Sequence, residues 1–168
     1  ADEGGAPANL AAPATATLVR LLVEEGKFDE ADQRLSAAKG KLSAEDSADL
    51  TRRVALGWAR SGKLDRADRM VAGDSSVNGL ALRGELKLLH GEVGAARDLL
   101  QQAGPYAGSR EDATERTTLL ALLQPLEADT VPEIGVGFLA LARADTTAAV
   151  AAFTSLAAAS GSRSMTTG

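Results

Sequence analysis

The phrase "GKFDEADQRL" fills residues 26–35, and a close copy, "GKLDRADRMV", fills residues 62–71. Both phrases follow a stretch rich in leucine, valine and alanine, and both place acidic residues just after the glycine. A glycine often stands just past the end of a helix, and acidic residues favour the first turn of the next one. Each phrase therefore predicts a helical hairpin whose turn lies at its glycine.

The spacing of this phrase continues through two further turns. Aligned on Gly26, Gly62, Gly91 and Ala144, the chain has alanine five positions later in every case: Ala31, Ala67, Ala96 and Ala149. Small or modest residues stand seven positions before the turn, namely Val19, Ala55, Gly84 and Gly137. Large apolar residues stand nine positions after it, namely Leu35, Val71, Leu100 and Phe153. Antiparallel helices need small residues at their closest approach, and one hairpin cannot bury its face alone, so stacked hairpins are expected.

Composition agrees with an all-α chain. Hydrophobic residues make up 45% of the 168 residues but aromatic residues only 3%, so the core must consist mainly of leucine, valine and alanine. Such small side chains suit closely packed helices better than a β-sandwich. No stretch alternates with period two for long enough to predict a strand.

The pattern resembles the tetratricopeptide repeat, a helix–turn–helix unit of about 34 residues. The resemblance implies antiparallel helix hairpins stacked into a short right-handed α-solenoid. We assign residues 1–13 to a lead-in, 14–159 to four to five irregular hairpins and 160–168 to a flexible tail. The turn-to-turn steps are 36, 29 and 53 residues, which makes the array irregular. The long step is expected to hold one extra helix or hairpin near residues 110–130, with Ser109 as a helix N-cap.

Arrays of this family bind peptides in a concave groove lined by their first helices, so the resemblance also implies a binding face. Helical offsets of three and four residues select its candidate residues. These are Arg20, Arg52, Leu56, Arg60, Glu85, Leu88 and Phe138. The three arginines would form a positive stripe that attracts an acidic or C-terminal peptide segment. In the alternative, each arginine pairs with a nearby acid and the stripe disappears. The lysine and asparagine with which some members clamp a terminal carboxylate are not matched.

Residues for catalysis or for a bound cofactor are scarce. The chain has no cysteine and one histidine, His90, which is expected at an exposed helix end. We therefore predict no catalytic residues, no metal and no cofactor. "GVGFLA", residues 135–140, loosely matches a dinucleotide motif, but helix packing explains Gly137 better because no strand precedes it. Trp58 is expected in the core between hairpins rather than in the groove.

Charge and hydropathy narrow the class of partner. The net charge of -5 argues against a nucleic-acid partner, and no apolar run is long enough to insert into a membrane. A soluble protein is expected. The compartment stays open between the cytoplasm and export, since the chain begins at Ala1, as after removal of a leader or trimming.

Two functions follow from these expectations. The first is a non-catalytic interaction module or scaffold that binds a protein or peptide segment. The second is a structural subunit that associates with itself or with a larger complex, because the last hairpin is rich in alanine where a repeat array usually carries a polar cap. An enzyme is the third and least favoured interpretation.

Overall fold

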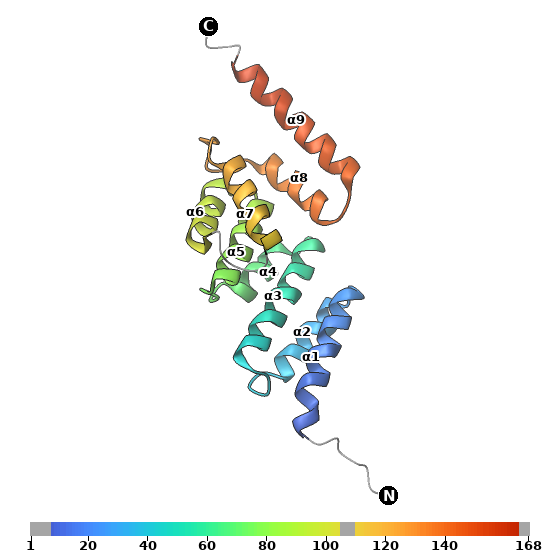
Figure 1. Cartoon of the computed structure of the whole chain (residues 1–168). Coiled ribbons are helices and arrows are strands. Elements are labelled where there is room, and N and C mark those ends of the chain that lie inside the picture. Colours follow the sequence, from blue (N-terminus) through green and yellow to red (C-terminus); the bar gives the residue numbers. More distant parts are fainter. Residues whose placement is uncertain (1–7, 105–109, 165–168) are drawn as a thin grey trace, which may run out of the picture.

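A computed structural model describes residues 8–104 and 110–164, and all regular structure within these ranges is α-helical, as predicted (Figure 1). The helices are α1 (Ala8–Glu24), α2 (Phe28–Ala37), α3 (Ala44–Arg60), α4 (Leu64–Val71), α5 (Val77–Leu89), α6 (Val93–Ala103), α7 (Arg110–Leu123), α8 (Pro132–Ala142) and α9 (Thr146–Ser164). Four hairpins result: α1–α2, α3–α4, α5–α6 and α8–α9. Among the described residues, the long step between turns holds one extra helix, α7, between the two hairpins, and Ser109 lies outside these residues.

The two ends of the chain are more helical than predicted. Helix α1 begins at Ala8, inside the predicted lead-in, and α9 continues to Ser164, inside the predicted tail. Pro13 removes one backbone hydrogen bond from α1, but the alanines on both sides have the highest helix propensity and carry the helix through it. The remainder of both predicted segments, 1–7 and 165–168, lies outside the described residues.

All four hairpins turn in the same way. The backbone N–H of the turn residue donates to the carbonyl three residues earlier, as from Gly26 to Val23 at 3.1 Å. The next N–H donates to the carbonyl five residues earlier, as from Lys27 to Leu22 at 2.8 Å, which completes a Schellman motif. The motif needs a positive φ, and the turn residues have one: Gly26 at 74°, Gly62 at 90°, Gly91 at 77° and Ala144 at 57°. Three turns have glycine in this conformation, and the fourth forces alanine into it.

The predicted register within the hairpins is confirmed. All four alanines that follow the turns are buried at the helix contacts. Gly84 and Gly137 make room for the large residue opposite: a Cβ on Gly84 would lie 2.7 Å from Leu100 Cγ, and one on Gly137 would lie 2.6 Å from Phe153 Cζ. Helix packing therefore accounts for Gly137.

The apolar core has two parts that meet at α5. One part joins α1 to α5 around Trp58, whose side chain is only 2% exposed and packs against Phe28 with ring centroids 5.6 Å apart. The prediction of Trp58 as a core residue is confirmed. The other part joins α5 to α9 around Leu88, Leu100 and Leu123. The first three hairpins follow one another in a row, because α1 contacts α3 and α3 contacts α5.

The last hairpin leaves this row. Helix α8 contacts both α5 and α3, whereas α9 packs against α8 alone among the described helices (Figure 1). At the start of α8, the N–H of Val131 donates to the carbonyl of Gly91 at 2.7 Å. Just past its end, Arg143 Nε donates to the carbonyl of Arg60 at 2.6 Å. Helix α8 thus reaches from the C-terminal end of α5 to the C-terminal end of α3.

Candidate binding cavity

The position of α8 creates a cavity of about 790 Å³ on one face of the row. Helices α3 and α5 supply residues from the hairpins, α7 supplies a side wall, and α8 closes one end. Most of the lining is apolar, and its leucines come from these four helices and, through Leu100, from α6. The polar lining residues are Arg60, Asn78, Glu85, Arg116 and Thr118.

Five of the seven predicted binding residues line this cavity. Leu56 and Arg60 come from α3, Glu85 and Leu88 from α5, and Phe138 from α8. These residues are up to 82 positions apart in the sequence, and the helix offsets of the hairpin alignment place them on one face. Leu88 is buried in the cavity floor, whereas Arg60 and Glu85 are exposed at the cavity surface.

Arg20 and Arg52 do not line the cavity, and the predicted continuous arginine stripe is wrong. Arg52 pairs with Asp74 at 2.9 Å, and Arg20 approaches Asp49 at 3.8 Å. Asp49 also accepts a 2.9 Å hydrogen bond from Arg53, so its carboxylate neutralises the α1–α3 surface locally. The alternative, in which arginines of the first helices pair with neighbouring acids, holds for these two positions.

The Asp74 carboxylate holds the junction of α3 and α5. Burial on its own would raise its pKa, but hydrogen bonds from the Ser76 hydroxyl and Arg52 lower the pKa below the ordinary value of 3.8. The Ser76 hydroxyl in turn accepts the N–H of Gly79 at 3.1 Å and so caps α5. A Cβ on Gly79 would collide with Asp74, so this position requires glycine. Arg52 therefore has a structural role at this junction.

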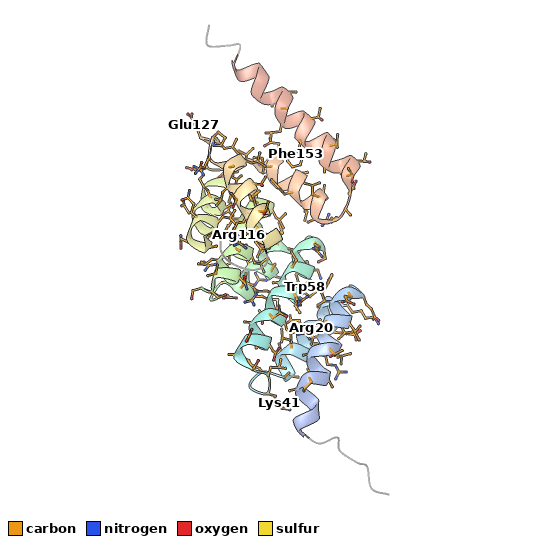
Figure 2. The ribbon with its side chains drawn as sticks, viewed as in Figure 1. Arg20, Lys41, Trp58, Arg116, Glu127 and Phe153 are labelled. Atoms are coloured by element: carbon orange, nitrogen blue, oxygen red, sulfur yellow. The ribbon has the colours of Figure 1, made fainter. Side chains whose placement is uncertain are left out.

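Sequence reasoning missed the contribution of α7. Arg116, Thr118, Leu119 and Leu122 line the cavity, and Figure 2 shows Arg116 well away from Arg20 on α1. Arg116 is only 7% exposed, and its Nη1 donates to the carbonyl of Gly104 at 3.0 Å. A signal was present in the sequence: Arg116 precedes Leu119, Leu120 and Leu123 by helical spacings, which places a charged residue on an apolar face.

A second hollow of about 480 Å³ is lined by several cationic side chains, but most of these side chains already have partners. Lys63 and Arg66 lie over the Trp58 ring, 4.4 and 4.0 Å from its centroid. Arg66 also pairs with Asp32 at 2.7 Å. His90 caps the end of α5 as predicted, but it is half-buried rather than exposed, and its Nε2 lies 2.8 Å from Asp68. Most of these cations already serve helix packing.

The chemistry that the cavity offers is recognition by shape, charge and hydrogen bonding. Its polar groups are two guanidinium groups, one carboxylate, one amide and one hydroxyl set among leucines. In the part of the chain that the structure describes, no cluster of three histidine, aspartate or glutamate side chains could hold a metal ion. Within that same part, no helix combines the length and the apolar character that crossing a membrane needs.

Comparison with known proteins gives no relative. No family model matches the chain, and neither the curated proteins nor the solved structures contain a significant match.

Proposed function

We propose that the chain is a non-catalytic interaction module that binds a protein or peptide segment in the cavity between α3, α5, α7 and α8. The observation that carries this proposal is the cavity itself, which is mostly apolar and lined by residues from five helices, α3, α5, α6, α7 and α8. Apolar pockets with a few convergent polar groups are the usual form of binding sites. Leu122 and Leu141 support the proposal because both line the cavity and both are exposed, at 62% and 49%.

The proposal extends to the resemblance to the tetratricopeptide repeat and to the architecture that it implies. The four shared turns and the row of α1, α3 and α5 support a short right-handed α-solenoid of the tetratricopeptide kind, in which first helices line the binding face. The displaced α8–α9 hairpin modifies this array by closing one end of the groove. A partner would then enter from the side that α8 leaves open.

Binding of a neutral peptide tests the proposal. The probe is a labelled peptide of about 14 residues, roughly four helical turns, with blocked ends and leucines three and four residues apart. Fluorescence anisotropy would measure its affinity for the native protein, for Leu122→Asp and for Leu21→Asp. The two leucines are similarly exposed, at 62% and 50%, but only Leu122 lines the cavity.

We expect Leu122→Asp to weaken binding by about tenfold or more, because burying a leucine contributes about 1.5–3 kcal/mol. Leu21→Asp should bind the peptide like the native protein. Equal affinity for all three proteins would exclude the cavity as the binding site. Far-UV circular dichroism of each variant would establish that the helices are intact.

A structural subunit is the second candidate, favoured by the outer surface of the last hairpin. Val136 on α8 is 60% exposed and Val150 on α9 is 59% exposed. Among the described helices, α9 packs against α8 alone. Light scattering over a range of concentrations, with Val150→Lys as the variant, would test it. Assembly that disappears in the variant supports this function, and a monomer at every concentration excludes self-association.

A further inference from the structure

We infer that Arg143 is a positioning residue of the cavity: it holds the C-terminal end of α8 against α3, while the N-terminal end of α8 is the pivot. The wall that Phe138 and Leu141 form is then adjustable at its α3 end. This inference rests on the proposed function, because it concerns how the same cavity is kept closed.

The N-terminal end of α8 is fixed by backbone contacts with the turn between α5 and α6. The N–H of Val131 donates to the carbonyl of Gly91 at 2.7 Å. A Cβ on Gly135 would lie 2.6 Å from the carbonyl oxygen of Leu89, so the two backbones are in direct contact there. Ile134 is only 5% exposed and belongs to the second part of the apolar core. Close packing of this kind leaves the end little freedom to move.

The C-terminal end of α8 is held in a different way, by an exposed side chain. Just past that end, Arg143 Nε donates to the carbonyl of Arg60 at 2.6 Å, and both residues are exposed. Leu141, two residues before Arg143, is 49% exposed although it lines the cavity. A hydrogen bond between exposed groups competes with water and contributes little to stability on its own. The α3 end of α8 is therefore the end that can open at small cost.

The turn of the second hairpin supplies the space for this contact. The N–H of Gly62 donates to the carbonyl of Ala59 at 2.9 Å, and the next carbonyl of α3, that of Arg60, accepts from Arg143. The guanidinium group lies over the turn, since a Cβ on Gly62 would lie 2.7 Å from Arg143 Nη2. A cation is favoured there, because the carbonyl groups at a helix C-terminus carry partial negative charge. Glycine at this turn thus serves the contact with α8 as well as the turn itself.

The residues that Arg143 brings together line the cavity at this end. They are Arg60 on α3 and, on α8, Phe138, Leu141 and Ala142. With the α3 end of α8 docked, these side chains form part of a preformed site, and binding to a preformed site costs less conformational entropy than binding to a mobile one. A partner that contacts α8 would in turn favour the docked position, because such coupling is reciprocal.

A role confined to α3 is the competing explanation for Arg143. The guanidinium group would then only stabilise the C-terminal carbonyl groups of α3, and α8 would stay in place without it. Loss of stability in a variant would fit both explanations. The position of α8 in the folded protein, and its response to a partner, separate them.

The position of α8 can be measured cleanly because the chain has no cysteine. Spin labels would be attached to two introduced cysteines, Glu45→Cys on α3 and Thr147→Cys at the start of α9, both at exposed positions. Double electron–electron resonance would give the distribution of distances between them, with and without the neutral leucine peptide of the binding experiment. The same proteins without labels would be used to measure the affinity for the peptide by fluorescence anisotropy.

We expect a narrow distance distribution with Arg143 in place and a broader one in Arg143→Ala, which the peptide should narrow again. The affinity of Arg143→Ala for the peptide should be about three- to tenfold weaker, because only molecules with α8 docked hold the complete cavity. Arg143→Lys should keep part of the affinity, since its ammonium group can donate to the same carbonyl.

Two glycine variants give a matched control. Gly62→Ala and Gly26→Ala add the same methyl group to a turn residue with a positive φ, 90° in one case and 74° in the other. The methyl group meets Arg143 in Gly62→Ala, whereas no described atom lies within 4 Å of it in Gly26→Ala. Gly62→Ala should therefore broaden the distance distribution as Arg143→Ala does, and Gly26→Ala should leave it narrow.

Three results would overturn the inference. The first is a distribution that stays narrow in Arg143→Ala, since α8 would then keep its position without this residue. The second is a broader distribution with unchanged affinity, which would show that the position of α8 does not matter to the site. The third is equal broadening in Gly62→Ala and Gly26→Ala, which would assign the effect to strain in the turns. If the native protein binds no peptide, the proposed function fails, and the distances alone still decide whether Arg143 holds α8.

Discussion

The α3–α4 and α8–α9 hairpins have the same turn but very different surroundings. Both close through the same pair of backbone hydrogen bonds, and both bury an alanine at the helix contact, Ala67 and Ala149. Helix α3 contacts α1, α2, α4, α5 and α8, whereas α9 contacts α8 alone among the described helices. The turn is thus set by local sequence, while the stability of a hairpin depends on what covers its outer face.

The largest expected difference concerns the aromatic residue of each hairpin. Trp58 is buried and contacts Phe28, whereas Phe153 is half-buried and packs edge-to-face on Phe138. Trp58→Ala should lower the free energy of unfolding by about 3–5 kcal/mol, and Phe153→Ala by less than about 2 kcal/mol. Urea denaturation followed by circular dichroism would measure both. Similar losses would mean that the two hairpins contribute equally to stability.

A smaller difference is expected when the closest approach of each hairpin is overpacked. Ala67→Leu should cost about 1–3 kcal/mol, because α4 is held between α3 and α5 and cannot move aside. Ala149→Leu should cost less than about 1 kcal/mol, because α9 can shift away from α8. The melting temperatures of the two variants provide the measurement. A larger loss for Ala149→Leu would contradict the idea that the last hairpin is free on one side.

The turns themselves can be compared through the residues that have a positive φ. Gly26→Ala should lower stability by about 1 kcal/mol through backbone strain alone, since no atom lies within 4 Å of the added Cβ. Ala144→Gly should raise stability by a few tenths to about 1 kcal/mol, because it relieves a φ of 57°. Opposite signs in the two urea midpoints would confirm that both positions carry the same turn. A loss of stability in Ala144→Gly would contradict it.

The smallest expected change in stability concerns the Asp74 carboxylate, which lies among the inner hairpins, and it appears only at acid pH. Burial raises the pKa of Asp74, but hydrogen bonds from Ser76 and Arg52 lower it further, so the folded pKa lies below 3.8. The stabilisation is therefore present above 3.8 and is lost as the pH falls through the folded value. As the pH falls from about 5 to 2, the melting temperatures of the native protein and of Asp74→Asn should become more similar. A constant gap would show that the Asp74 charge does not stabilise the fold.

Much of the fold could be predicted because it depends on the spacing of residues within each hairpin. The turn residues, the buried alanines and the glycines opposite Leu100 and Phe153 all follow from one alignment of the sequence. The five cavity residues followed from the same alignment, since helical offsets determine which side chains share a face. Helix α7 was also located, although not its part in the cavity.

The predictions were wrong or incomplete where segments that are distant in the sequence meet. The pairing of Arg52 with Asp74 depends on how the α4–α5 loop folds back on α3, which no spacing within a helix encodes. The position of α8 depends on contacts between Gly135 and the turn at Gly91, where a Cβ on Gly135 would lie 2.8 Å from the Gly91 nitrogen. A glycine in a sequence signals close approach but does not say to which segment.

The hydrogen bond from Arg143 to Arg60 also has a consequence for the order of folding. In a row of hairpins that touch only their neighbours, folding can start anywhere and spread, because every contact is local in sequence. The Arg143–Arg60 bond joins positions 83 residues apart, so α8 can dock only after the ends of α3 and α5 are in place. We expect docking of α8 to be a late event, and Arg143→Ala to speed unfolding in stopped-flow experiments while leaving the refolding rate nearly unchanged. Closure of the cavity would then report completion of the fold, and a chain stalled before this step would be folded in its first hairpins yet lack the wall that α8 supplies to the cavity.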